Sequence, residues 1–227
     1  MCGRFNIIDD PSLQALLKTL GVAPSVPGSM INVAPTEDIP VVTGSVGARE
    51  MRAMRWWLTP SWAPEPSTRY SMFNAKSETI ATSRAFRGPF RRQRGIVPAS
   101  SFIEWHSGPE GKQAWLIESE EAGALALASI WDLWQRDGAT LYSCCLITTA
   151  ATSAFEPWHH RMPVMLRAAD YDSWLDPQQA LPDLDHYFAP SLPGPLRLSP
   201  LPRAVNNARN KAPEVLQPSA AGQVIRP

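Results

Sequence analysis

The chain has 227 residues and a formal net charge of zero, from 21 basic and 21 acidic side chains. Its length allows one large domain or two small ones with a substantial core, and its balanced charge gives no general basic signature. Three cysteines without a C-x-x-C pair exclude a disulfide framework and a zinc ribbon, and no leader or apolar run of about 18 residues argues for secretion or membrane insertion, so we expect a cytoplasmic protein.

The N-terminal stretch Met1-Cys2-Gly3-Arg4-Phe5 offers distinctive chemistry. Because the residues after Met1 are small, we expect Met1 to be trimmed, which leaves Cys2 with an α-amine and a thiol on adjacent carbons. These groups titrate near about pH 8 and pH 8.5, so each keeps an unprotonated fraction at neutral pH. Such a residue is either an aldehyde trap, through an imine that the thiol closes to a thiazolidine, or an acyl-transfer nucleophile whose amine is the base. It is otherwise an incidental residue in a flexible terminus.

The first predicted helix covers residues 12–20. Asp10 is its expected N-cap, Pro11 occupies the first helical position, and Gly21 ends it. The stretch 31–36 that follows the next loop is too short to predict a regular element.

The rest of the chain predicts many short strands with few helices between them. Two strands are joined as a hairpin by a turn that contains Gly44 and Gly47, and a Pro-rich loop that holds Trp62 follows them. The predicted strands are 39–43, 51–58, 95–97, 102–105, 114–118, 124–131, 141–148, 163–166 and 196–199, and helical content is predicted at 75–86 and 169–175. This pattern favours an α+β fold with a bent, mostly antiparallel, barrel-like β core and peripheral helices. We expect a single domain over residues 1–217 and a disordered tail over 218–227.

The basic residues are concentrated in one segment. Of the 21 basic residues 17 are arginine, and between Arg49 and Arg94 ten basic residues stand against three glutamates. A balanced protein with one arginine-dense segment favours a localised anion-binding face, although a solvated charged surface has the same composition.

Three residues outside the N-terminus are candidates for chemistry. Asn74 precedes a helical segment, where an asparagine is most often a cap. Glu104 lies among apolar neighbours on a predicted strand, where it faces either solvent or a pocket in which desolvation raises its pKa. His159 adjoins His160, so at most one of the two faces a given site, and with Arg161 it would place a proton donor beside a phosphate-binding guanidinium. The four histidines form no ligand cluster, so no metal site is expected.

Six motifs together resemble those of the SOS response-associated peptidase family, whose bacterial and human members are abasic-site processing proteins. In chain order they are Met1-Cys2-Gly3-Arg4-Phe5, Asn32-Val33-Ala34-Pro35-Thr36, Phe73-Asn74-Ala75-Lys76-Ser77-Glu78-Thr79, Phe102-Ile103-Glu104-Trp105, His159-His160-Arg161-Met162-Pro163 and Ala204-Val205-Asn206-Asn207. The resemblance covers residues 2 to about 217. It implies a single domain that crosslinks Cys2, through a thiazolidine, to the ring-opened aldehyde of an abasic site in single-stranded DNA or at a junction with duplex. No cofactor is implied.

The resemblance also implies roles for individual residues. Asn74 matches the asparagine that positions the Cys2 amine, Glu104 matches the acid/base carboxylate, and His159 matches the proton donor for opening of the sugar ring. The positions implied in DNA binding are Arg4, Asn32, Pro35, Trp62, Lys76, Trp105 and Arg161. The family name records a proposed autoproteolytic step at the N-terminus, which we interpret as maturation and not as hydrolysis of other proteins.

Two positions depart from the family pattern. Lys76 stands where many members have arginine, which keeps the charge but loses bidentate phosphate contact. The pair Trp56-Trp57 precedes Leu58 where a Trp-Gly sequence is commoner, and Leu58 cannot copy a glycine at positive φ.

Two other functions remain open from the sequence. Glutamine amidotransferases also begin Met-Cys-Gly, so an N-terminal cysteine amidohydrolase is one alternative. A non-catalytic module that binds single-stranded DNA is the other, because a basic groove with stacking aromatic residues suits that ligand. We expect a monomer, associated with the nucleoid when it binds DNA.

Overall fold

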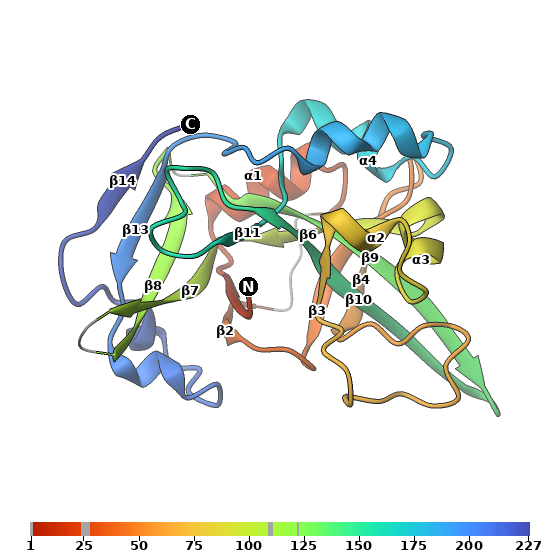
Figure 1. Cartoon of the computed structure of the whole chain (residues 1–227), viewed down its shortest axis with the longest axis horizontal. Helices are drawn as coiled ribbons and strands as arrows, with labels where there is room; N and C mark the ends of the chain where they lie inside the picture. The colour runs from red at the N-terminus through yellow and green to blue at the C-terminus, as the bar shows by residue number, and fades with distance from the viewer. Residues whose placement is uncertain (1, 24–27, 109–110, 122) are drawn as a thin grey trace.

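The structure, a computed structural model, describes residues 2–23, 28–108, 111–121 and 123–227 (Figure 1). Its larger sheet has the strand order β11-β10-β4-β3-β6-β9-β12, and a further pairing between β9 and β10 closes five of these strands into a barrel. Only the pairings of β10 with β4 and with β5 are parallel in this sheet. The strands are β3 (Asp38–Thr43), β4 (Glu50–Trp56), β5 (Asn74–Lys76), β6 (Arg94–Ala99), β9 (Leu125–Arg136), β10 (Ala139–Ala150), β11 (Arg161–Pro163) and β12 (Met165–Leu166).

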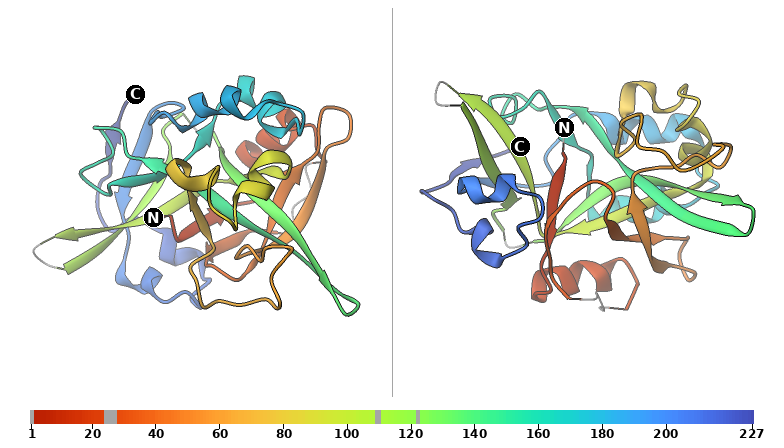
Figure 2. Two further views of the ribbon diagram at one scale, coloured as in Figure 1. Left: turned by 45° about the vertical axis from the view of Figure 1, so that its right-hand side comes forward. Right: turned by 90° about the horizontal axis from the view of Figure 1, so that it is seen from below.

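A smaller antiparallel sheet lies beside the barrel, and it contains the N-terminal strand (Figures 1 and 2). Its strand order is β14-β13-β8-β7-β1-β2, so the chain ends and begins in the same sheet. The strands are β1 (Arg4–Ile7), β2 (Met30–Val33), β7 (Ser101–Gly108), β8 (Gly111–Ser119), β13 (Leu196–Pro200) and β14 (Gln223–Ile225). β1 lies between β2 and β7.

The helices are short and lie outside the sheets (Figure 1). They are α1 (Pro11–Thr19), α2 (Ser77–Ile80), α3 (Arg87–Arg92) and α4 (Tyr171–Leu175), with 3-10 segments η1 (Ala168–Asp170), η2 (Leu181–Phe188), η3 (Arg203–Asn206) and η4 (Pro213–Leu216). α1 begins as predicted, because Asp10 accepts a hydrogen bond from the Leu13 N–H at 2.9 Å. Gly21, at φ 72°, follows its end. None of the helices among the described residues is both long and apolar enough to cross a membrane.

The core joins the two sheets. Phe5 on β1 packs edge-on against Trp56 on β4 at a centroid distance of 4.9 Å, and both rings are fully buried. The Trp56 indole N–H also donates to the Phe73 carbonyl at 2.8 Å, which fixes the residue before β5. The end of the N-terminal strand is thereby held against the barrel.

The mostly antiparallel, barrel-like α+β fold is confirmed, as is the β3–β4 hairpin. Three local expectations are wrong. Residues 31–33 belong to β2, which is ordered by pairing with β1. Asn74 lies in β5 and not at a helix N-cap, which is Lys76. The expected disordered tail contains β14, which pairs with β13 and buries Ile225.

Candidate functional site

Cys2 is fully buried where the barrel and the smaller sheet meet. It directly precedes β1, whose Arg4 pairs with Ile103 and whose Phe5 pairs with Phe102 on β7. Its Sγ lies 3.7 Å from the Arg4 carbonyl oxygen, to which the thiol donates. The strand β1 therefore fixes the position of this residue.

Asn74 holds Cys2 from the barrel side. β5 runs parallel to β10, with Asn74 opposite Leu146, and the Asn74 Nδ2 donates to the Cys2 carbonyl oxygen at 2.8 Å. The Asn74 Oδ1 is buried and has no hydrogen-bond partner in the part of the chain that the structure describes. An acceptor is thus available beside the backbone of Cys2.

Glu104 approaches the same place from the smaller sheet. It lies on β7 opposite Trp115 on β8 and is only 2% exposed. Burial raises the pKa of its carboxyl to about 7, so it exchanges protons near neutral pH. This is the range in which a carboxylate serves both as acid and as base.

The Cys2 thiol is held in its neutral form. Burial raises its pKa far above the usual range, and the negative charge of Glu104 raises it further. The Cys2 thiol is therefore not ionised at neutral pH, so any attack by Sγ requires transfer of its proton during the reaction. Glu104 is the nearby group whose own pKa suits that transfer.

His159 lies just before β11, on the opposite edge of β10 from β5. It is half-buried, and its ring stacks on that of the exposed His160 at a centroid distance of 4.4 Å. Burial lowers the pKa of His159 to about 4, so the ring is neutral at pH 7. Its Nδ1 lies 2.9 Å from the Arg161 backbone nitrogen and 3.0 Å from the Arg161 carbonyl oxygen. In the tautomer in which Nδ1 accepts from the Arg161 N–H, Nε2 carries the proton. Of the two adjacent histidines, His159 is the half-buried one, and its neutral ring can donate a hydrogen bond from Nε2.

The buried Arg161 forms an ion pair with the exposed Glu78. Its guanidinium binds both carboxylate oxygens of Glu78 on α2 and donates to the Thr148 carbonyl oxygen at 2.7 Å. These hydrogen bonds and the charge hold the pKa of Glu78 at about 2. The guanidinium predicted to grip phosphate is therefore already bound by a residue that sequence reasoning did not single out.

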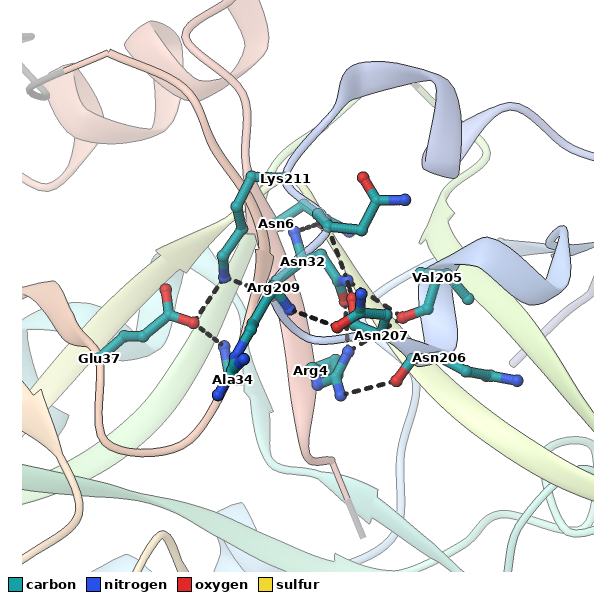
Figure 3. Close-up of polar contacts among 11 residues, drawn as sticks. Arg4, Asn6, Asn32, Ala34, Glu37, Val205, Asn206, Asn207, Arg209 and Lys211 are labelled. Atoms are coloured by element: carbon teal, nitrogen blue, oxygen red, sulfur yellow. Dashed lines mark hydrogen bonds and ion pairs between the residues drawn. The ribbon is translucent and has the colours of Figure 1, made fainter.

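A polar cluster ties β1 and β2 to the chain's C-terminal part (Figure 3). Arg4 donates to the Asn32 Oδ1 at 2.6 Å and to the Val205 carbonyl oxygen at 3.1 Å. Its guanidinium carbon lies 5.5 Å from the centre of the Trp105 ring, whose indole N–H donates to Asn206 at 2.8 Å. Arg4 and Trp105, both predicted to bind DNA, thus lie together and in contact with the motif at 204–207.

Asn32 is the buried centre of that cluster. Its side-chain amide donates to the carbonyl oxygens of Val205, Asn207 and Asn210 at 3.0–3.1 Å, and its own N–H donates to Asn6 at 2.7 Å. Its backbone has φ 52°, a conformation that asparagine tolerates better than most residues. The geometry gives Asn32 internal partners, so the predicted contact with DNA remains a prediction.

The turn after β2 carries Pro35. The Glu37 N–H donates to the Ala34 carbonyl oxygen at 3.2 Å, and Thr36 has φ 81°. That conformation is uncommon for a β-branched residue, and it leaves Pro35 half-exposed at the tip of the turn. Lys211 anchors the turn through Glu37, a contact that sequence reasoning missed.

The remaining predicted contacts with DNA lie on the surface. Trp62 is 52% exposed, and the Arg84 guanidinium lies 4.2 Å from the centre of its ring. Lys76 is exposed at the end of β5. Leu58 is not among the non-glycine residues with positive φ, and its N–H donates to the Met72 carbonyl oxygen at 3.0 Å, so the loop forms without the glycine conformation.

The site therefore combines a buried cysteine, an amide that holds it and a carboxyl group that titrates near neutrality. Within the described ranges, no group of three or more His, Cys, Asp or Glu residues is arranged to hold a metal ion. The arrangement suits proton-coupled attack by the groups of Cys2.

A family model described as SOS response associated peptidase (SRAP) matches residues 1–208. The chain is 30% identical over 224 residues to the abasic site processing protein YoqW of Bacillus subtilis, with 96% of this chain and 99% of that protein covered. It is also 30% identical over 202 residues to the abasic site processing protein HMCES of Gallus gallus, which covers 77% of this chain and 59% of that longer protein.

Solved structures share the fold. A crystal structure of a protein from Bacteroides thetaiotaomicron superimposes with a TM-score of 0.73 at 22% identity and covers 82% of both chains. A second, from Bordetella bronchiseptica, gives a TM-score of 0.72 at 22% identity over 84% of this chain and 95% of that one. At this identity the likeness establishes the arrangement of the strands.

Proposed function

The chain belongs to the SOS response associated peptidase (SRAP) family, and on this premise we propose that it processes abasic sites in DNA. The relatives at 30% and 31% identity that carry this activity in their names extend over nearly the whole chain. Single-stranded DNA and its junctions with duplex are the substrates we propose, because a duplex hides the sugar C1′ of the lesion. A protein with this proposed activity takes part in DNA repair.

The proposed reaction is covalent capture by Cys2 after removal of Met1. The α-amine of Cys2 adds to the aldehyde C1′ of the ring-opened sugar, and loss of water gives an imine. The thiol then adds to the imine carbon: a C–S bond forms, and the S–H proton is transferred, through a base, to the nitrogen. The product is a five-membered thiazolidine between the protein and the DNA, and no oxidant or reductant is consumed.

Three neighbouring residues assist this reaction in our proposal. Asn74 holds the Cys2 carbonyl and offers its buried Oδ1 to the α-amine. Glu104 accepts and returns protons as the amine and thiol react. His159 matches the family's histidine for opening of the sugar ring, and because its ring is neutral at pH 7 it assists by donating a hydrogen bond from Nε2 to the ring oxygen as the ring opens. Burial of Cys2 limits the access of water, which favours closure over hydrolysis of the imine.

The observation that carries the proposal is the approach of Asn74 and Glu104 to Cys2 from two different sheets. The first forms a 2.8 Å hydrogen bond, and the second has a pKa of about 7 and acts on the thiol electrostatically. Abasic aldehydes are scarce, so neighbours that orient both groups of Cys2 supply an effective concentration that free cysteine lacks.

The test uses protein with a verified N-terminal Cys2 and a single-stranded oligonucleotide that contains one abasic site. We expect a shifted band on a denaturing gel, absent with a lesion-free oligonucleotide and absent with Cys2→Ala. The matched control is Cys144→Ala, which removes a buried thiol of β10 and should keep the band. Borohydride should trap the imine, which an amide-hydrolysing cysteine would not form.

No band from protein whose first residue is Cys2 would overturn the covalent chemistry. Retained binding to the oligonucleotide would then favour a non-catalytic single-stranded DNA-binding module. Release of ammonia from glutamine would favour the amidohydrolase.

A further inference from the structure

The arginine-dense segment divides into paired and unpaired residues in the structure. Arg49 forms an ion pair with Asp172, and Arg52 forms one with Glu50. Arg94 is buried and donates to backbone carbonyl oxygens, among them that of Trp174 at 2.6 Å. Arg49 and Arg94 are thus held by partners within the fold, and Arg52 is paired with a neighbouring carboxylate.

Four other arginines of the segment surround one cavity. Arg84, Arg87, Arg91 and Arg92 are exposed, and none of them forms an ion pair with another described residue. They line a cavity of about 540 Å³ on α3 together with Trp62. We refer to these four arginines as the α3 arginine face.

One acidic residue, Asp132, lines this cavity, and its carboxylate is bound by backbone N–H groups. Asp132 accepts hydrogen bonds from the Ser61 N–H at 2.7 Å and the Leu133 N–H at 2.9 Å. It therefore holds the turn that carries Trp62 in place and does not form an ion pair with any of the arginines. Four positive charges stay close together without neutralisation, which costs free energy unless an anion binds.

An aromatic surface adjoins the α3 arginine face. Trp62 and Arg84 also line a second cavity of about 490 Å³, which Tyr70 borders. Tyr70 is 68% exposed and has the Arg69 guanidinium 5.6 Å from its ring centre. Exposed aromatic rings beside unpaired arginines are the combination that holds single-stranded nucleic acid.

This surface lies on the same side of the molecule as β5. α2 follows β5 directly, and Figures 1 and 2 show α2 and α3 side by side. In Figure 1 both lie away from the C-terminus and β14. A strand that leaves the site beside Asn74 can therefore cross α2 and reach the α3 arginine face.

We propose that the α3 arginine face binds backbone phosphates of the DNA strand that flanks the lesion, while bases of that flank stack over Trp62 and Tyr70. The proposal rests on the proposed function, since it concerns the same DNA. It assigns the arginines of α3 to the flank and leaves the lesion to the site around Cys2. The affinity for the flanking strand should then depend on salt. Capture of the aldehyde by Cys2 does not require binding of the flank.

The test measures affinity for lesion-free single strands, so it does not depend on crosslinking. Fluorescence anisotropy with Cys2→Ala protein compares oligonucleotides of about 4 and about 16 nucleotides. The salt slope is the steepness with which the logarithm of the affinity falls as the logarithm of the salt concentration rises. Arg91→Ala/Arg92→Ala should lower this slope for the long strand by about 1.4. Between about 50 and 200 mM salt, the variant should then lose about sevenfold less affinity than the parent protein. Arg91→Lys/Arg92→Lys keeps the charge and should restore the slope. The remote control, Arg226→Ala, lies beyond β14 and should change nothing.

A second experiment tests on which side of the lesion the bound flanking strand lies. Abasic oligonucleotides are extended on the 5′ or the 3′ side of the lesion, and crosslinking to native Cys2 protein is followed at limiting concentration. Extension on one side should speed crosslinking, and Arg91→Ala/Arg92→Ala should remove that gain. An unchanged salt slope in the alanine variant, or a gain from extension that survives it, would overturn the proposal. Loss of crosslinking with the salt slope still sensitive to these arginines would count against the proposed chemistry alone.

Discussion

The site around Cys2 and the α3 arginine face differ in how much water reaches their polar groups. Cys2, Asn74 and Glu104 are buried between two sheets, whereas Arg91 and Arg92 are exposed on a short helix. Burial displaces the pKa values of Cys2 and Glu104 from their ordinary range. The arginines carry a permanent positive charge, as arginine side chains do in proteins.

This difference separates two kinds of sensitivity. Groups whose pKa lies near neutrality respond to pH, and they lose their function when a neighbour moves or water enters. Exposed cations act through counterion release, so their contribution changes with salt and hardly with pH. If the two regions are independent, variants in one should leave the characteristic response of the other intact.

The largest effect we expect is on the rate of crosslinking in Glu104→Gln. Glutamine has nearly the same shape but cannot exchange a proton, so the rate at saturating DNA should fall by about 10²- to 10⁴-fold. Affinity for lesion-free DNA and its salt slope should stay at wild-type values. Rapid-quench sampling on denaturing gels checks the rate, and a wild-type rate would remove Glu104 from the mechanism.

The same substitution should change the pH dependence of stability. Burial raises the pKa of Glu104 to about 7 in the folded protein, against about 4.3 in the unfolded chain, so the folded state binds the extra proton between these values. Stability is therefore lost as pH rises from about 4.3 through 7. Glu104→Gln avoids this loss, and its free energy of unfolding relative to wild type should rise by about 3 kcal/mol between pH 4 and pH 8. Urea denaturation measures this difference; exposed Glu156→Gln is the control, and a flat difference would mean that the carboxyl titrates normally.

The sequence was sufficient to predict those elements whose structure depends on residues close together in the chain. The Asp10-Pro11 start of α1 and the Gly44/Gly47 turn between β3 and β4 are local signals, and both elements formed as predicted. β1, β2 and β5 are each stabilised by strands distant in sequence. Short segments of this kind carry no periodicity, which is why Asn74 was interpreted as a helix cap.

The candidate site shows the same limit. Cys2, Glu104 and His159 could be singled out because each residue type in its setting indicates a chemistry. The partners of Arg161 and Asn32 could not, since Glu78 and the carbonyl oxygens of residues 205, 207 and 210 are brought to them by the fold. Composition also gave no reason to expect β14, whose burial of Ile225 depends on β13.

A smaller effect is expected from Trp62→Ala, a substitution on the exposed surface beside the α3 arginine face. Loss of one stacked base should weaken affinity for lesion-free single strands by about 1–3 kcal/mol, or about 5- to 150-fold. The rate at saturating DNA should not change, because Trp62 lies outside the buried site. Anisotropy titration and saturating gels measure the two quantities. Trp62→Phe keeps a ring and should recover most of the affinity, whereas a loss of rate at saturation would show that the regions are coupled.

The smallest effect we expect tests the residue that links the two regions. Glu78 lies on α2, next to α3, and binds Arg161 of β11 near the site. Its hydrogen bonds from Arg161 hold its pKa at about 2, below its unfolded value of about 4.3, so this contribution is present above the unfolded pKa and is lost as pH falls through about 2. Because Glu78 is half-exposed, solvent screens the pair, and Glu78→Gln should cost about 1 kcal/mol at pH 7.

That cost should shrink toward zero in urea denaturation as pH falls from about 4.3 to about 2. The matched control is Glu50→Gln, which breaks the exposed pair with Arg52 and should change stability by less than about 0.5 kcal/mol. Equal losses in the two variants would mean that burial of Arg161 adds nothing to its ion pair. A loss in Glu78→Gln accompanied by slower crosslinking at saturating DNA would instead show that α2 transmits the state of the exposed face to the buried site, and the two regions would then act as one.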